Sequence, residues 1–126
     1  MKFVIYDFET SGRSARFDQI LQAGLICYDE ELREIEKVNL RSRINPDIVP
    51  SIMALKVNRL LVSDLLSEKN SSYEMIRKLQ RAMQSYNPAI FCGYNSIFFD
   101  EEFLRQGLWE NFLYPYLTTS NNNLLT

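Results

Sequence analysis

The stretch FVIYDFETSG, residues 3–12, constrains the fold more than any other part of the sequence. Its β-branched and aromatic residues predict a buried strand over residues 2–8. Two carboxylates, Asp7 and Glu9, stand one residue apart at the end of this run, so a strand would project both from one face. Two such acids repel, and they favour a cation between them, with Mg²⁺ or Mn²⁺ as the best match to oxygen ligands. A strand that simply ends at solvent would carry the same tripeptide.

The pattern of the remaining chain predicts a mixed α/β domain with the order β-β-β-α-α-β-α. Residues 18–29 and 34–44 read as further strands, and the acidic turn between them indicates an antiparallel meander. After Pro46 and Pro50, residues 51–68 predict one or two short helices.

A longer helix follows, and Ser71 or Ser72 is its expected N-cap. Its apolar face is predicted to carry Tyr73, Ile76, Leu79, Ala82 and Met83. Residues 87–95 then read as a buried strand beyond Pro88, and residues 98–113 as a helix.

Composition narrows the class of protein. A length of 126 residues allows one domain with a real core. The net charge of −2 argues against a module that holds nucleic acid by bulk positive charge. Cys27 and Cys92 lie in apolar surroundings and are expected to be reduced core thiols. The sequence has no membrane-length apolar run and no signal-peptide layout, so a cytoplasmic location is expected.

A second acidic motif, GYNSIFFDEEF, spans residues 93–103. Here a strand ends at a glycine, and Asp100 falls in the first turn of the following helix, where acids also complement the helix dipole. If this strand lies beside the first one, Asp100 can reach the face of Asp7 and Glu9. Three carboxylates at the ends of two adjacent strands have the layout of a two-metal site for phosphodiester hydrolysis.

The two motifs together, DFETSG and GYNSIFFDEEFL, resemble the DEDD superfamily of 3′–5′ exonucleases. The longer stretch GYNSIFFDEEFLRQGLWENFLYPY is most similar to the bacterial exonuclease I family, and DQILQAGLICYDEEL and VPSIMALKVN also resemble it. The resemblance implies a ribonuclease-H-like mixed sheet with flanking helices, with residues 1–126 forming an exonuclease domain. It further implies 3′ ends of single-stranded DNA as substrate, two Mg²⁺ ions (Mn²⁺ as an alternative), and a single-stranded-DNA-binding protein as a candidate partner.

The family's functional positions transfer residue by residue. Asp7, Glu9 and Asp100 match metal-binding and catalytic positions. Four further residues match positions that contact the terminal nucleotide or shape the site: Thr10, Asn95, Phe99 and Val57. Lys56 stands where the family often has glycine.

The third family motif, a histidine followed by a fourth metal-binding aspartate, is missing. The chain contains no histidine, and neither Tyr114 nor Tyr116 has the following acid that a tyrosine variant would need. Two explanations stay open: a C-terminally truncated piece of a longer enzyme, which we favour because the last residues still follow the family, or a shortened homologue without catalysis. Either predicts weak metal binding, slow or absent hydrolysis, and self-association through an uncovered apolar face.

Other functions also stay open. An exoribonuclease or a proofreading exonuclease of the same superfamily would share both motifs, because contacts to the 2′-hydroxyl decide the sugar. A non-catalytic interaction module on the same fold is the alternative from another class. A plain α/β domain with acidic loops would require both motifs to be coincidental.

Overall fold

The computed structural model describes residues 1–93 and 99–117. Within this part of the chain, the elements follow the predicted order β-β-β-α-α-β-α, with two short helices in the first helical region. Their bounds are β1 Lys2–Thr10, β2 Ile20–Tyr28, β3 Glu34–Arg41, α1 Ile52–Asn58, α2 Val62–Ser67, α3 Ser72–Ser85, β4 Ala89–Cys92 and α4 Asp100–Glu110.

The strands form a mixed sheet in the order β3-β2-β1-β4. Strands β1, β2 and β3 pair antiparallel as the predicted meander, whereas β4 pairs parallel to β1. The β1–β4 pairing stops at Ile5 and Cys92, although β1 continues to Thr10. The second half of β1 is therefore paired with β2 on one side, and its other edge is free of β4.

The strand boundaries differ from the prediction at one functionally important place. Strand β1 runs through Asp7 and Glu9 and ends at Thr10, so Glu9, which the prediction left outside the strand, lies within it. The prediction stopped at residue 8 because acidic residues have low strand propensity. Backbone pairing with β2, as far as Glu9 opposite Gln22, overrides that propensity.

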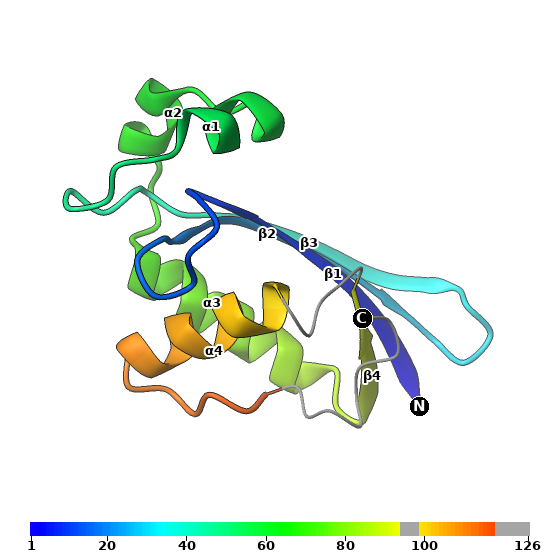
Figure 1. The fold of residues 1–126 in the computed structure, drawn as a ribbon. Helices are drawn as coiled ribbons and strands as arrows, with labels where there is room; N and C mark the ends of the chain where they lie inside the picture. The colour runs from blue at the N-terminus through cyan, green and yellow to red at the C-terminus, as the bar shows by residue number, and fades with distance from the viewer. Residues whose placement is uncertain (94–98, 118–126) are drawn as a thin grey trace.

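One face of the sheet is covered by the two longer helices, which lie side by side beneath it in Figure 1. Alternate residues of β1 point into this layer, and Val4, Tyr6 and Phe8 are all buried. Phe91 of β4 and Leu104 of α4 belong to the same core. The period-2 pattern of the strand and the helical periodicity of α3 and α4 thus bury one shared apolar layer.

Helix α3 begins where the sequence predicted. Ser71 is the N-cap, and its side chain and that of Glu74 form a reciprocal capping box. The predicted apolar face needs one correction, because Tyr73 is half exposed whereas Met75 is fully buried. The buried stripe is centred on Met75, Ile76, Leu79 and Met83, which leaves Tyr73 at its edge.

Helices α1 and α2 lie beyond one end of the strands, as Figure 1 shows. They are held by a small separate cluster of buried residues, Leu21, Ile44 and Leu65. Ser51 caps α1 by accepting a hydrogen bond from the Ala54 amide. This arrangement places the helical pair next to the strand end that carries the acids.

Two smaller predictions concern redox state and membranes. Cys27 and Cys92 are both buried and neither forms a disulfide, as predicted. In residues 1–93 and 99–117, every helix is too short or too polar to cross a bilayer.

Candidate active site

Asp7 and Glu9 lie on the face of the sheet opposite the core. Asp7 is exposed and Glu9 is half-buried. In the antiparallel register, Asp7 stands opposite Gly24 and Glu9 opposite Gln22. Because Gly24 has no side chain, the space next to the Asp7 carboxylate on β2 stays open, which leaves both acids room to move toward a shared ligand.

Asp100 comes from the first turn of α4 and is 4% exposed. Its pKa is raised to about 7, first by burial and then by the negative charges of Asp7 and Glu9. The start of α4 therefore lies close enough to the second half of β1 for the charges of Asp7 and Glu9 to act on Asp100. The structure therefore brings the three predicted acids into one electrostatic neighbourhood.

The pKa of Glu9 is perturbed in the same direction as that of Asp100. Its pKa is raised, chiefly by burial and secondly by the charge of Asp7. A site that disfavours its own carboxylate charges is one that a cation would stabilise, because the cation removes the repulsion and compensates for the missing hydration.

The three acids lie near one another, but their side chains are not arranged around a single metal-binding point. Considering residues 1–93 and 99–117 alone, no three acidic or cysteine side chains are gathered tightly enough to hold a metal ion as they stand. The donor set itself, three carboxylates with two raised pKa values, fits a hard divalent cation.

A cavity of about 940 Å³ lies between the end of β1 and α1. None of the three acids lines it, but the sequence neighbours of Glu9 and Asp100 do. Thr10, Val57 and Phe99 all line it, so three of the four predicted nucleotide-contacting residues come together. Asn95, the fourth, lies outside the described residues. The cavity is also lined by Gly12, Arg13, Ser51, Met53, Ala54 and Asn58, and Lys56 is not among its lining residues.

Hydrogen bonds fix the walls of this cavity relative to β1. The Asn58 side-chain amide donates to the carbonyl of Thr10 at 3.2 Å, and the Ser51 backbone amide donates to the carbonyl of Ser11 at 2.7 Å. The first bond joins α1 to the last residue of β1, and the second joins the N-cap of α1 to the residue that follows β1. Sequence reasoning missed Asn58 and Ser51, since their role depends on a contact between segments about 40 residues apart in the chain.

The loop after β1 is organised by Asp18, which sequence reasoning also missed. Its carboxylate accepts hydrogen bonds from the Ser11 hydroxyl and the Ser14 amide, each at 3.0 Å. A Cβ at Gly12 would stand 2.4 Å from this carboxylate, so the position requires glycine. The Ser11–Gly12 pair with a nearby aspartate is the sequence signal that could have revealed this turn.

Phe99 occupies the entrance to α4. Its ring lies against Phe103 with centroids 5.0 Å apart, and it also lines the cavity. A single side chain thus packs against the core helix and presents an aromatic surface to the space beside the acids.

Comparison with known proteins shows which family this chain resembles. The family model for the DNA polymerase family B exonuclease domain matches residues 1–109. Exodeoxyribonuclease I of Buchnera aphidicola subsp. Schizaphis graminum is 26% identical over 124 residues, covering 98% of this chain and 26% of that protein. The chain thus spans about a quarter of the length of this curated relative.

Solved structures of exonuclease I share the fold of this chain. A moderately thermophilic exonuclease I from Methylocaldum szegediense is 28% identical, with a TM-score of 0.87 over 99% of this chain and 27% of that one. The zinc-bound form of an E. coli exonuclease I complex with single-stranded DNA is 21% identical, with a TM-score of 0.88 over 99% of this chain and 27% of that one.

These matches confirm the predicted ribonuclease-H-like sheet with flanking helices. The family model covers most of the chain, and the solved structures share its fold. The chain belongs to the family of DNA polymerase family B exonuclease domains, within the DEDD superfamily of 3′–5′ exonucleases.

Proposed function

We propose that residues 1–126 carry the first two motifs of a divalent-metal-dependent 3′–5′ exonuclease that acts on the ends of single-stranded DNA. The observation that supports this most is the burial of Asp100 within the field of Asp7 and Glu9, next to a cavity of nucleotide size. An arrangement that raises the pKa values of its own acids destabilises the fold. Such arrangements are found at functional sites, and metal binding is the function that accounts for this one.

In this proposal Asp7, Glu9 and Asp100 supply the oxygen ligands, and membership of the exonuclease family implies divalent ions. Two Mg²⁺ ions are the expected pair, with Mn²⁺ as an alternative, since both prefer carboxylate ligands. When bound, such ions activate an attacking water and stabilise the leaving oxygen of a phosphodiester. Asp7 and Glu9 remain hydrated enough to adjust, whereas Asp100 is fixed by the first turn of α4.

The cavity beside the acids is the proposed place for the terminal nucleotide. Phe99 and Val57 offer apolar surfaces to a base, and Thr10 lies next to the acids at the end of β1. The Thr10 hydroxyl donates to the carbonyl of Gly12 at 2.6 Å, which holds the cavity floor in place. Asn95 belongs to the proposed site by resemblance alone.

The same proposal predicts slow chemistry for the 126-residue chain. It contains no histidine to act as the general base, and three carboxylates bind a divalent ion less tightly than four. The expected partners are 3′ ends of single-stranded DNA and a single-stranded-DNA-binding protein. A cytoplasmic location fits the two buried cysteines, which form no disulfide.

The decisive experiment replaces Asp7 by Asn, which preserves shape and removes the charge. In a longer chain that also carries the third motif, release of nucleotides from the 3′ end of a labelled single-stranded DNA in Mg²⁺ should fall at least about 100-fold, since even a residue that only supports a metal ligand can contribute that much. Mn²⁺ affinity, measured by calorimetry, should fall with it. Glu34→Gln, an exposed acid on β3, is the matched control and should change neither quantity.

Each alternative function has its own outcome. Unchanged Mn²⁺ affinity and hydrolysis in Asp7→Asn would contradict the proposal and favour a plain domain. Tight nucleic-acid binding with no metal affinity in the parent chain would favour the non-catalytic module. Faster hydrolysis of an RNA of the same sequence would replace single-stranded DNA by RNA as substrate.

A further inference from the structure

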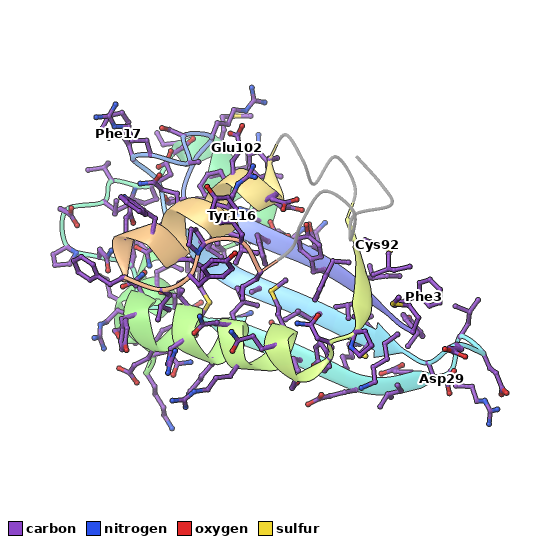
Figure 2. The ribbon with its side chains drawn as sticks, turned by 90° about the horizontal axis from the view of Figure 1, so that it is seen from below. Phe3, Phe17, Asp29, Cys92, Glu102 and Tyr116 are labelled. Carbon is purple, nitrogen blue, oxygen red and sulfur yellow. The ribbon has the colours of Figure 1, made fainter. Side chains whose placement is uncertain are left out.

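A second cavity, of about 610 Å³, lies between the loop after β1, the helix α4 and the segment that follows it. Three arginines and two aromatic residues line it: Arg13, Arg16, Arg105, Trp109 and Tyr116. We call these five residues the arginine pocket. In Figure 2, Phe17, Glu102 and Tyr116 lie toward one end of the molecule, and Phe3 and Asp29 toward the other.

The charge of the arginine pocket is opposite in sign to the net charge of the whole chain. The chain has a net charge of −2, yet among the described residues the cavity gathers three guanidinium groups against one carboxylate, Glu102. Within the same part of the chain, none of the three arginines forms an ion pair with an acid at 4 Å or less, and the Arg16 guanidinium lies 5.4 Å from the centre of the Phe17 ring. Three such cations around one hollow form a site complementary to an anion.

The aromatic residues of the pocket narrow the class of anion. Trp109 is 69% exposed and Tyr116 is 55% exposed, although both could have packed into a core. Proteins that bind single-stranded nucleic acids present exposed aromatic rings next to arginines, because bases stack on the rings while phosphates contact the guanidinium groups. Carboxylates of an acidic peptide would satisfy the charges but would leave both rings exposed.

Arg13 connects this pocket to the candidate active site. It lines both cavities, and among the described residues it is the one charged side chain that lines the cavity beside the acids. A strand whose terminal nucleotide occupies that cavity would therefore pass Arg13 and enter the arginine pocket. The position of Arg13 is set by the loop that Asp18 and Gly12 hold in shape.

We propose that the arginine pocket is a binding subsite for single-stranded DNA upstream of the terminal nucleotide, in which Arg13, Arg16 and Arg105 contact phosphates and Trp109 and Tyr116 stack on bases. This inference rests on the proposed function, because it places the 3′ end of the strand in the neighbouring cavity. It assigns the three arginines to holding and orienting the substrate, and not to the reacting atoms.

The chain supplies its own probe, since Trp109 is its single tryptophan. Fluorescence of the 126-residue chain is titrated with a thymidine dodecanucleotide in EDTA, so that no hydrolysis occurs. Stacking should quench Trp109, whereas a thymidine dinucleotide, which fits the terminal cavity alone, should leave its fluorescence unchanged. Absence of quenching by the dodecanucleotide, equal quenching by the dinucleotide, or displacement by an acidic peptide at equal concentration would each overturn the proposal.

Charge substitutions test the phosphate contacts. Arg16→Ala and Arg105→Ala should each weaken binding of the dodecanucleotide and lower the slope of log affinity against log salt by about 0.7, the value for one phosphate of a single strand. Arg81→Ala, an exposed arginine of α3 outside the pocket, is the matched control and should leave both quantities unchanged. Equal effects of all three variants would indicate binding by general charge and contradict a pocket.

An aromatic substitution tests the stacking. Trp109→Ala should weaken binding measured by fluorescence anisotropy of a labelled dodecanucleotide by about 5-fold to 100-fold. Tyr73→Ala on α3, half exposed like Tyr116, is the control and should bind as the parent chain does. Thermal unfolding of each variant shows whether the fold is kept, and an unchanged affinity in a folded Trp109→Ala would overturn the assignment.

The two proposals fail separately. Asp7→Asn should lose hydrolysis and keep the quenching of Trp109, because Asp7 lies outside the pocket. Quenching together with a Mn²⁺ affinity that is unchanged in Asp7→Asn would refute the catalytic proposal alone. Asp7-dependent hydrolysis without quenching would refute the subsite alone.

Discussion

The two faces of β1 differ as much as any two regions of this molecule. On the covered face Val4, Tyr6 and Phe8 are buried under α3 and α4. On the open face Ile5 is 50% exposed, and Asp7 and Glu9 carry the charge. Neighbouring residues of one strand therefore serve two purposes, since alternate side chains project from opposite faces.

The difference teaches why the chemistry is on the open face. A carboxylate turned into the covered layer would lose its hydration without a partner and would cost several kcal/mol. On the open face, water and a cation can compensate it. Asp100 lies at the boundary between these environments. It is buried in the first turn of α4, and its pKa is raised by this burial and by the charges of Asp7 and Glu9.

The largest expected effect comes from weakening the covered face. Leu25→Ala, at a fully buried position opposite Tyr6, should lower the free energy of unfolding by about 2–5 kcal/mol, because it leaves a cavity. Ile5→Ala on the open face should cost less than about 1 kcal/mol, since Ile5 is already half exposed. Urea unfolding measures both, and equal losses of stability would show that the two faces are packed alike.

The second prediction concerns Asp100 at the boundary. Its pKa rises from an ordinary 3.8 to about 7 on folding, so the folded chain binds more protons than the unfolded chain between these values. The free energy of unfolding in EDTA should therefore receive a contribution that falls as pH rises toward 7 and levels off above it. Asp100→Asn removes this contribution, so its stability advantage over the parent should grow from pH 5 to pH 8.

Urea unfolding at pH 5 and pH 8 measures the Asp100 contribution directly. Asp64→Asn, an exposed acid in the first turn of α2, is the control and should show no pH-dependent advantage. A parent and an Asp100→Asn variant with parallel pH profiles would contradict the electrostatic coupling. Adding Mg²⁺ should stabilise the parent more at pH 8 than at pH 5, because protons compete with the cation for Asp100.

The smallest expected effect concerns the apolar part of the open face. No described helix lies against this face in Figure 1, and Ile5 and Ile26 stand opposite one another on it. Self-association of the chain through this surface should weaken at least about tenfold in Ile5→Lys, since a buried aliphatic side chain contributes about 1.5–3 kcal/mol. Sedimentation equilibrium measures it, with Val49→Lys in an exposed loop as control. Identical association in both variants, or a monomeric parent at high concentration, would contradict the prediction.

The sequence predicted the elements and their order well, because local periodicity carries that information. Capping of α3 by Ser71 and the position of Asp100 in the first turn of α4 were both readable from short motifs. Its errors are also local in origin. Tyr73 was assigned to the buried face from spacing alone, and β1 was ended at residue 8, before Glu9 and Thr10, because propensity ignores strand pairing.

The candidate site was predictable only as a set of residues. Asp7, Glu9 and Asp100 could be named from two motifs, and Thr10, Val57 and Phe99 from the family resemblance. Asn58 could not be identified from pattern, because its value lies in one hydrogen bond to a residue 48 positions away. Arg13 and Arg16 likewise became informative only when the fold placed them beside Arg105 and Trp109.

The sequence by itself determined the period of each element, the two acidic motifs and the absence of histidine, because these depend on residue identity and near neighbours. The tertiary structure alone decided that Asp7 and Glu9 lie close enough to raise the pKa of Asp100. It also decided that three arginines gather around one cavity in a chain of net negative charge. Electrostatic energies and cavities depend on separations through space, and a linear pattern does not encode those separations until the chain has folded.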